Sequence, residues 1–417
     1  MTTPRFTRFE KIDELLTMAG PAGIGASDNA RLGVIHDAAL VVDPAGRVAW
    51  VGERTAVPAA YDAAERVDLD APLVLPGLVD PHTHLVFAGD RALDFEARCR
   101  GESYRTIAAR GGGIRTTVAA TRAASSETLM ALGAERLAIL LARGVTTVEI
   151  KSGYGLDVAT EQRQLRVARA LGERGPQRIV TTLLFHVPPD PHPSARAAWI
   201  DTCIDELLPA VHAAATADHV DVFCDDGAFT PSEAEALLVK ARALGFPLKA
   251  HADQLSATGF AKTAARLGAL SLDHVEHLDP AAIATMREHG TVAVLLPAAS
   301  IFLGDRARPP VAALREAGVP MALATDLNPG SSPTTDPWLV ATLACTQYGL
   351  TPAEALLGCT ARAAAALGLR DGTGTLAPWS PADFLVARVP SWPHLLYGLG
   401  HAPIARTYIG GRLAMRA

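Results

Sequence analysis

The sequence predicts an α/β protein: a (β/α)8 barrel of the TIM type with a small β-sandwich-like domain built from both chain ends. Its 417 residues are too many for one ordinary domain, but they suit a barrel of about 250 residues with a smaller companion. Short apolar runs alternate with helical patterns through the middle of the chain, and both ends are rich in strand patterns. With 49% hydrophobic and 20% charged residues, the chain can fill a large core.

The two ends of the chain predict one composite β domain. Residues 32–42 form an apolar run that stops at an Asp-Pro-Ala-Gly turn, and residues 47–52 return from it, which is typical of a hairpin. Further strands are predicted at residues 67–69, 383–389 and 404–409. We therefore assign residues 1–75 together with 380–417 to the small β domain, and residues 76–379 to the barrel.

The middle of the chain predicts eight parallel strands. Each candidate is a short apolar run that would be buried on both faces, as the strands of a parallel sheet are. They are predicted at residues 73–79, 145–150, 179–185, 220–224, 247–250, 269–272, 291–296 and 320–324. Because no Gly-x-Gly-x-x-Gly follows the first of them, a dinucleotide-binding sheet is disfavoured and a closed barrel is preferred.

Helix signals separate these strands. Thr230 opens a capping box with Glu233, and Gly245 ends that helix. Further helices are predicted at residues 127–143 and after Asp279. A barrel built in this way carries its active site at the C-terminal ends of the strands.

Residues that commonly bind metals follow several of the predicted strands. His82 and His84 follow the first strand and, being two apart in an extended segment, face the same side. His251 follows the fifth strand and Asp326 the eighth. Since a barrel brings these ends around one mouth, the four side chains form a candidate site for zinc or ferrous iron, with room for a water. His274, after the sixth strand, can orient that water or polarise a new oxyanion; the alternative is a core histidine bonded to the backbone.

Such a site suits the hydrolysis of a C–N bond. A metal ion lowers the pKa of its bound water from about 16 to about 7, which supplies hydroxide at neutral pH, and Asp326 can accept the proton. The other histidines considered are predicted to lie on the surface: His212, His219, His277, His289, His394 and His401.

The segment between the first strand and its helix, residues 85–125, is long, and long loops inside compact domains are usually functional. Arg91 is the arginine of this segment nearest to His84, so it is the best placed to bind a substrate carboxylate through two hydrogen bonds. A glycine run at residues 111–113 lacks the Lys-Ser/Thr pair of a phosphate-binding loop and is interpreted as a lid hinge. The remaining polar residues suit a solvated loop and include Arg98, Arg100, Tyr104 and Arg105.

Composition excludes several classes of partner. The net charge of −6 argues against nucleic acid, which favours a basic surface, but a small anionic substrate is still allowed because local arginines can override a mild global field. Five cysteines without a Cys-x-x-Cys pair argue against disulfides or a thiolate zinc site and favour a reducing cytoplasm. No apolar run is long enough to span a membrane, and no secretory leader is evident.

Three longer motifs carry a family resemblance. Residues 76–84 read Pro-Gly-Leu-Val-Asp-Pro-His-Thr-His, which resembles the first-strand signature of the amidohydrolase superfamily. Residues 147–155, Thr-Val-Glu-Ile-Lys-Ser-Gly-Tyr-Gly, and 325–330, Thr-Asp-Leu-Asn-Pro-Gly, are more specific and resemble the imidazolonepropionase family, whose members open a ring in histidine degradation. Shorter agreements lie at residues 111–114, 251–254 and 295–297. The resemblance spans residues 74–411.

The resemblance implies one divalent ion per chain, Zn or Fe, held by His82, His84, His251 and Asp326, with Asp326 and His274 catalytic. It implies hydrolysis of the cyclic C–N bond of 4-imidazolone-5-propanoate, a small anionic heterocycle, to N-formimidoyl-L-glutamate by attack of metal-bound hydroxide. A homodimer is the family expectation. The implied substrate-binding residues are Arg91 at the propanoate, Tyr154 and His186 close to the ring or chain, and Gln254, Asn328, Gly330 and Ser331 around the remainder.

The chain departs from the family pattern at three places. Gln254 stands where many relatives carry a glutamate, and because an amide cannot shuttle a proton, proton transfer falls to Asp326 and His274. Phe260 follows Gly259 where a second glycine is expected, and residues 300–301 replace an expected aromatic. These changes bear on pocket shape and therefore on the choice of substrate.

Three alternatives stay open from the residues alone. An amidohydrolase-type aminohydrolase (deaminase) acting on a purine or pyrimidine-like ring would use the same four ligands, but it requires the glutamate that Gln254 replaces. A dinuclear cyclic amidase requires a lysine at the end of the fourth strand, whereas here Lys151 ends the second. A catalytically inactive barrel kept as a scaffold would be expected to have lost ligands, and metal uptake would distinguish it.

Overall fold

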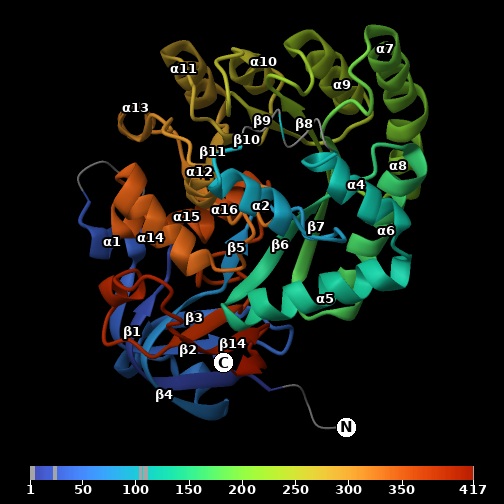
Figure 1. The fold of residues 1–417 in the computed structure, drawn as a ribbon. Coiled ribbons are helices and arrows are strands. Elements are labelled where there is room, and N and C mark those ends of the chain that lie inside the picture. Colours follow the sequence, from blue (N-terminus) through green and yellow to red (C-terminus); the bar gives the residue numbers. More distant parts are fainter. Residues whose placement is uncertain (1–4, 22–25, 103–105, 107–110, 417) are drawn as a thin grey trace.

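Figure 1 shows the computed structural model, which describes residues 5–21, 26–102, 106 and 111–416. Among these residues the strands form two sheets, one of eight and one of seven strands. Helices surround the larger sheet, and the smaller sheet joins the blue N-terminal strands to the red C-terminal ones (Figure 1). The predicted fold class, a barrel with a small β domain from both chain ends, is confirmed. Tyr104 and Arg105 lie outside the described residues.

The larger sheet is parallel, and its strands are neighbours in the order of the sequence. Each is short and buried along nearly its whole length, as the apolar runs predict. Its strands are β5 (Leu78–Asp80), β6 (Val145–Lys151), β7 (Arg178–Phe185), β8 (His219–Cys224), β9 (Leu248–Ala252), β10 (Ser271–His274), β11 (Val292–Leu295) and β12 (Met321–Leu323).

The barrel closes just beyond the ends of β5 and β12. Thr83 and Leu327 form a parallel bridge, and the N–H of His84 donates to the carbonyl of Leu327 at 2.9 Å. The Asp80 carboxylate accepts from the backbone N–H and the hydroxyl of Thr325 at 3.1 and 2.5 Å. The first and eighth strands therefore join at the segments that carry His82, His84 and Asp326.

One strand prediction, residues 73–79, is wrong in its boundary. The run is divided between β4 (Glu65–Pro76), which pairs with β1 and with β13 (Phe384–Ala387) in the small sheet, and β5, which begins the barrel. The change of sheet takes place at Gly77, where a Cβ would lie 2.2 Å from the Thr146 hydroxyl. The run is apolar throughout, so its pattern carries no mark of this division.

Helices cover the outside of the barrel (Figure 1). The predicted capping box is present, with Thr230 and Glu233 at the start of α9 (Pro231–Ala243). No helix of the described residues is long and apolar enough to cross a membrane. Further α-helices among the described residues are α5 (Ser126–Ala142), α6 (Val158–Arg174), α7 (Pro193–Thr202), α8 (Leu208–Ala214), α10 (Phe260–Arg266), α11 (Pro280–His289), α12 (Pro297–Leu303), α13 (Val311–Ala317), α14 (Pro337–Tyr348), α15 (Pro352–Gly358) and α16 (Ala361–Ala366).

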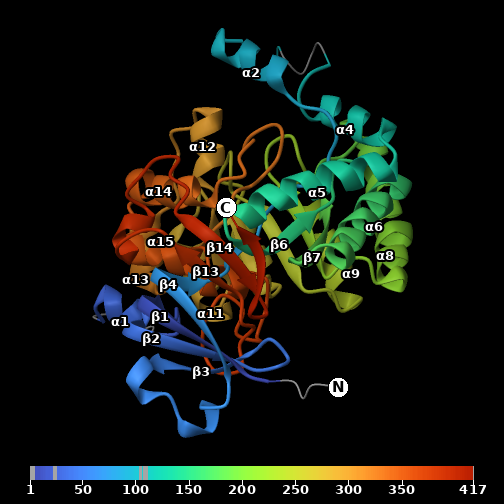
Figure 2. The same ribbon diagram turned by 90° about the horizontal axis from the view of Figure 1, so that it is seen from below.

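The described part of residues 85–125 contains two helices where the sequence predicts a long loop. These are α2 (Ala92–Cys99) and α4 (Ile114–Ala123), and Figure 2 shows α2 standing away from the body of the molecule. The carboxylate of Asp94 accepts from the N–H of Gly113 at 2.8 Å, which ties the two helices together. Gly113 has a φ of +75° at the start of α4, a conformation that favours glycine.

The smaller sheet has the strand order β15-β14-β13-β4-β1-β2-β3. Its apolar side chains share one core across the strands, with Phe9 and Phe384 in edge-to-face contact and Phe384 stacked on Tyr408. The expected strand at residues 32–42 starts later, because Leu32 ends the short helix α1 (Asp28–Leu32) and Gly33 caps it. The remaining strands are β1 (Thr7–Leu16), β2 (Val34–Val42), β3 (Val48–Glu53), β14 (Ile404–Ile409) and β15 (Arg412–Arg416). The domain limits at residues 75 and 380 stay a prediction.

Candidate metal centre

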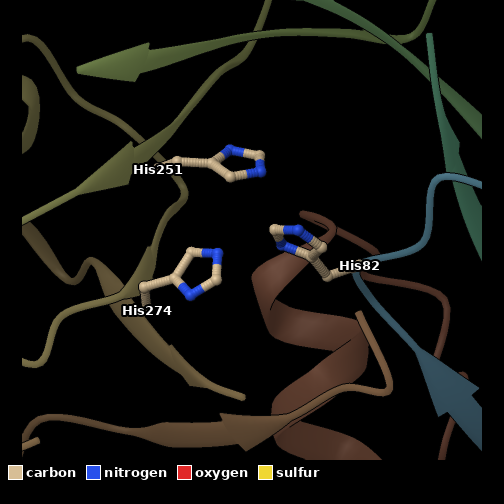
Figure 3. Close-up of side chains that lie close together, drawn as sticks. All are labelled: His82, His251 and His274. Carbon is tan, nitrogen blue, oxygen red and sulfur yellow. The ribbon is translucent and has the colours of Figure 1, made fainter. Parts of the chain in front are cut away.

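The predicted ligands converge at the C-terminal mouth of the barrel. His82 and His84 follow β5, His251 lies in β9, His274 ends β10 and Asp326 follows β12. Figure 3 shows the rings of His82, His251 and His274 directed toward one another from three separate segments. Convergence of this kind is the property on which the sequence-based hypothesis depends.

Ligand atoms lie within a coordination sphere of one another. Asp326 Oδ1 is 3.4 Å from Nε2 of His82 and 3.5 Å from Nε2 of His84. The rings of His82 and His251 are 4.5 Å apart between centroids, and those of His251 and His274 are 5.4 Å apart. Two sets, His82–His84–Asp326 and His82–His251–His274, each offer ligand atoms that all lie within 4.8 Å of one another.

Several ring nitrogens of the centre are buried without a hydrogen-bond partner among the described residues. They include Nε2 of His82 and Nε2 of His251. Leaving such atoms unpaired away from water costs free energy, and each one requires an explanation. A divalent cation would satisfy both nitrogens, so the imidazoles and the carboxylate fit the ion that the sequence predicts.

The pKa values of three histidines of the centre, His84, His251 and His274, favour neutral rings beside the Asp326 carboxylate. Burial lowers the pKa of His84, and it lowers that of His274 to about 3. Burial lowers the pKa of His251 to about 4, although Asp221 acts in the opposite direction. Burial would raise the pKa of Asp326, but the nearby rings of His82 and His84 outweigh it and hold this pKa well below its usual range. Neutral imidazole and ionised carboxylate are the forms that bind a metal.

His82 differs from the other rings. Burial and the ammonium of Lys151 lower its pKa, but the carboxylates of Asp273 and Asp326 outweigh them and raise it to about 9. The Nδ1 of His82 lies 2.6 Å from Asp273 Oδ2. Because a carboxylate only accepts, Nδ1 carries the hydrogen and Nε2 is left to face the centre.

Backbone strain is concentrated at the same place. His274 has a φ of +78° and Asp326 a φ of +52°. Side chains rarely adopt this left-handed region, and residues held there often belong to functional sites. The two strained positions are the last residue of β10 and a residue of the loop after β12, and both side chains line the mouth.

A pocket of 560 Å³ opens over the centre. Its wall includes His84, His251, His274 and Asp326, whereas His82 is fully buried beneath. The predicted substrate-binding residues all line it: Arg91, Tyr154, His186, Gln254, Asn328, Gly330 and Ser331. Ile114, Val187, Phe223, Leu255 and Leu303 form the apolar part of the wall.

Arg91 presents its guanidinium to this pocket. Its Nε donates to the hydroxyl of Thr117 at 2.9 Å, and Asp94 lies 3.8 Å from its Nη1. A Cβ at Gly330 would stand 3.2 Å from the guanidinium carbon. The side chain is therefore held in place by α4 on one side and by the loop after β12 on the other, which suits it to bind an anion.

Tyr154 and His186 adjoin the metal centre. Their rings lie 5.8 and 5.7 Å from that of His84 and 5.5 Å from each other. Burial raises the pKa of the Tyr154 hydroxyl, so it keeps its proton and can donate. Burial lowers the pKa of His186 to about 3, and its Nδ1 lies 3.1 Å from the carbonyl of Gly153.

Asn328 has a structural role in the loop after β12 that the sequence does not reveal. Its amide nitrogen donates to the carbonyl of Asp326 at 2.7 Å, and its amide oxygen accepts from the backbone N–H groups of Gly330 and Ser331, both at 2.8 Å. Asn328 therefore shapes the loop after β12. Ser331 in turn places its Oγ 3.4 Å from Asp326 Oδ2.

Five charged residues inside the barrel were missed as functional candidates: Glu149, Lys151, Asp221, Lys249 and Asp273, all fully buried. Asp221 and Asp273 contact the ring nitrogens of His251 and His82. The signal in the sequence is a charged residue inside an apolar strand run or directly after it, since a parallel strand buried on both faces has no solvated face for a charge.

One histidine predicted to be on the surface is buried. His219 begins β8 and is 5% exposed, because the strand starts one residue earlier than its apolar run indicates.

Comparison with known proteins identifies the family. The sequence model of the amidohydrolase family matches residues 73–414. An imidazolonepropionase of Polaromonas sp. is 48% identical over 93% of this chain and 92% of its own, and one of Paracoccus denitrificans is 47% identical over 91% and 95%. The chain belongs to the imidazolonepropionase family of amidohydrolases. The barrel also resembles guanine deaminase of E. coli, with a TM-score of 0.69 and 17% identity over the full length of both chains, a likeness of fold.

Family membership bears on the alternatives left open by the sequence. The two imidazolonepropionases are 47–48% identical to this chain. The adenosine deaminase of Xanthomonas campestris with bound zinc is 19% identical, with a TM-score of 0.67 over 99% of this chain and 93% of its own. The imidazolonepropionase interpretation is therefore the better supported. The individual roles of the pocket residues stay predictions.

Proposed function

We propose that this chain hydrolyses 4-imidazolone-5-propanoate to N-formimidoyl-L-glutamate, a step of histidine degradation. The observation that carries the proposal is the presence in one pocket of a cation-binding set and an anchored guanidinium, Arg91. The substrate has a cyclic amide at one end and a carboxylate at the other, so it requires both. The family relationship supports the same reaction.

His82, His84, His251 and Asp326 would hold the metal ion, zinc or iron. When bound, the ion would lower the pKa of a water molecule toward neutrality and polarise the ring carbonyl. Asp326 is suited to two tasks because Oδ1 faces His82 and His84 while Oδ2 faces Ser331. One oxygen can ligate while the other accepts a proton from the attacking water.

The reaction balances with these groups alone. Water adds its oxygen to the ring carbonyl carbon, the bond from that carbon to the ring nitrogen breaks, and the nitrogen takes up the proton that Asp326 has accepted. The neutral His274 can donate a hydrogen bond to the oxyanion that forms on the carbonyl oxygen. Gln254 cannot take part in proton transfer, and this leaves Asp326 as the group that moves the proton.

The substrate carboxylate would be bound by Arg91, with the hydroxyl of Tyr154 as a second donor. The apolar wall at Ile114, Val187 and Phe223 would cover the methylene groups of the propanoate. Gln254, Gly330 and Ser331 would line the remainder, and His186 would pack beside the ring.

We propose one metal ion rather than two. Asp221, His251 and Asp273 also lie close enough together to hold a cation. The ammonium of Lys151, however, is 2.6 Å from Asp221 Oδ2 and 3.4 Å from Asp273 Oδ2. A positive charge of the chain itself therefore occupies the inner position.

Product analysis tests the function. The purified protein, loaded with zinc or iron, is incubated with 4-imidazolone-5-propanoate, and N-formimidoyl-L-glutamate is measured by mass spectrometry. Guanine and cytosine serve as controls, with released ammonia as the readout. Release of ammonia from either ring without turnover of the imidazolone would replace this proposal with a deaminase.

We also propose a cytoplasmic homodimer. All five cysteines lie in the described part of the chain and are free thiols, which suits a reducing compartment.

The dimer is supported by the projecting helix α2 (Figure 2), where Leu93 and Phe95 expose 77% and 45% of their surface. A second copy of the chain would cover these two side chains. Sedimentation velocity would distinguish a dimer from a monomer.

A further inference from the structure

A closed set of charges lies in the barrel directly beneath the metal centre. Lys151 and Lys249 face the carboxylates of Glu149, Asp221 and Asp273, and all five side chains have no exposed surface. We call these five residues the buried charge cluster. We propose that Lys151 and Lys249 are positioning residues that aim the metal ligands, acting through Asp221, Asp273 and the backbone beside His82.

Lys151 acts on two ligands through two carboxylates. Its Nζ lies 2.6 Å from Asp221 Oδ2, and Asp221 Oδ1 lies 3.1 Å from Nδ1 of His251 and accepts from its backbone N–H at 3.2 Å. Nζ is also 3.4 Å from Asp273 Oδ2, which is bonded to Nδ1 of His82 at 2.6 Å. A single ammonium therefore fixes both carboxylates against both rings, so that each ring turns Nε2 toward the metal.

Lys249 acts on the chain that carries His82. Its Nζ donates to the carbonyl of Pro81, the residue before His82, at 2.8 Å. It also donates to Glu149 Oε2 at 2.7 Å, and Lys249 itself lies two residues before His251 in β9. Lys249 thereby links its own strand, β9, which carries His251, to the segment after β5, which carries His82.

Glu149 forms ion pairs with both lysines and accepts a hydrogen bond from a residue of β7. Its Oε2 lies 3.0 Å from Nζ of Lys151, and its Oε1 accepts from the hydroxyl of Thr182 at 2.5 Å. Its carbonyl accepts from the hydroxyl of Thr83 at 2.6 Å. Thr83 stands between His82 and His84, so β6 also fixes the segment that bears both.

The charges also match the proposed ion. With His82 neutral, as an imidazole that binds a metal must be, the three carboxylates of the buried charge cluster exceed its two ammonium groups by one charge, and Asp326 adds another. A divalent cation would balance both. Buried charges that lack a partner are strongly unfavourable, so the cluster favours a doubly charged ion in the position that the ring nitrogens face.

A neutral pair of substitutions tests this inference. Lys151→Met with Asp221→Asn removes one positive and one negative charge and leaves the balance of the cluster unchanged. Zinc affinity is measured by competition with a chromophoric chelator, and the visible spectrum of the cobalt-loaded protein reports ligand geometry. The expected result is a roughly 10- to 100-fold loss of zinc affinity, the usual effect of losing such outer partners, with a changed cobalt spectrum.

The matched control is Arg315→Met with Glu354→Gln. It removes an ion pair of 2.7 Å that lies between α13 and α15, and it should leave zinc affinity and the cobalt spectrum unchanged. A folded Lys151→Met/Asp221→Asn protein with the parent's zinc affinity and cobalt spectrum would overturn the inference, because the cluster would then serve stability alone.

Ser271→Ala is a milder variant that tests the same cluster if the double variant does not fold. The Ser271 hydroxyl donates to Asp273 Oδ1 at 2.6 Å, so its loss should weaken zinc binding by roughly two- to tenfold. Unchanged affinity and an unchanged cobalt spectrum in that variant would likewise overturn the inference. The inference rests on the proposed metal site but not on the substrate: a parent that binds zinc and leaves the imidazolone intact would refute the proposed reaction only.

Discussion

Replacing Arg91 by alanine is expected to raise the KM for 4-imidazolone-5-propanoate far more than it lowers kcat. The guanidinium is held by the Thr117 hydroxyl at 2.9 Å and borders Gly330, so a carboxylate that enters the pocket meets a donor already in position. The scissile bond lies at the other end of the substrate, beside the metal centre. The lost interaction is therefore made equally with the substrate and with the transition state, which changes KM rather than kcat.

The magnitude follows from the kind of interaction lost. A hydrogen bond to a charged group is worth about 1.5–3 kcal/mol, which corresponds to a rise in KM of roughly 10- to 150-fold. Thr117→Val is the matched comparison, because it keeps the charge of Arg91 and removes only one of its hydrogen bonds. Its effect should be smaller, roughly two- to tenfold.

Steady-state kinetics on two substrates separates binding of the carboxylate from general damage to the pocket. The second substrate is the propanamide analogue, in which the carboxylate is replaced by a neutral amide. The parent protein and Arg91→Ala should turn it over with nearly equal kcat/KM. An unchanged KM for the natural acid, or an equal loss on acid and amide, would refute the assignment of Arg91.

Three further predictions concern the metal, pH and a helix cap. His84→Ala should abolish retention of zinc or iron in metal analysis while the metal-free protein keeps its unfolding midpoint; a variant that retains one ion per chain would contradict the ligand set. Burial raises the pKa of Glu276 from 4.5 to about 8. Between these two pH values Glu276 is protonated in the folded chain and ionised in the unfolded chain. The folded chain therefore loses up to about 1.4 kcal/mol of stability for each pH unit by which the pH rises through this range. Urea unfolding should therefore show that the stability of Glu276→Gln relative to the parent rises between pH 4.5 and 8 and stays constant at higher pH. A stability difference that does not depend on pH would argue against a buried, protonated Glu276. Thr230→Ala removes the cap that accepts from the N–H of Glu233 and should cost about 1 kcal/mol in the same assay, whereas no change would mean that α9 does not depend on its capping box.

Much of the site was accessible from the sequence because strand ends carry the chemistry of a barrel. His82, His84, His251 and Asp326 follow strands that their apolar runs disclose, and barrel closure necessarily brings such ends together. Arg91 could be selected because it stands near His84 in the chain. The division of residues 73–79 between two sheets was not accessible, since an uninterrupted apolar run suits either sheet and only pairing with β13 decides which.

The sequence by itself determined the order of strands and helices, the candidate metal ligands, and the family. Only the tertiary structure decided how those residues are held. Lys151 meets Asp221 across 70 positions, Lys249 meets Glu149 across 100, and His82 meets Asp273 across 191. No local pattern specifies which buried ammonium faces which carboxylate, because their distances arise only when the barrel closes and water is excluded. The same closure makes each unpaired charge costly, and for that reason the partners of the metal ligands are a property of the fold.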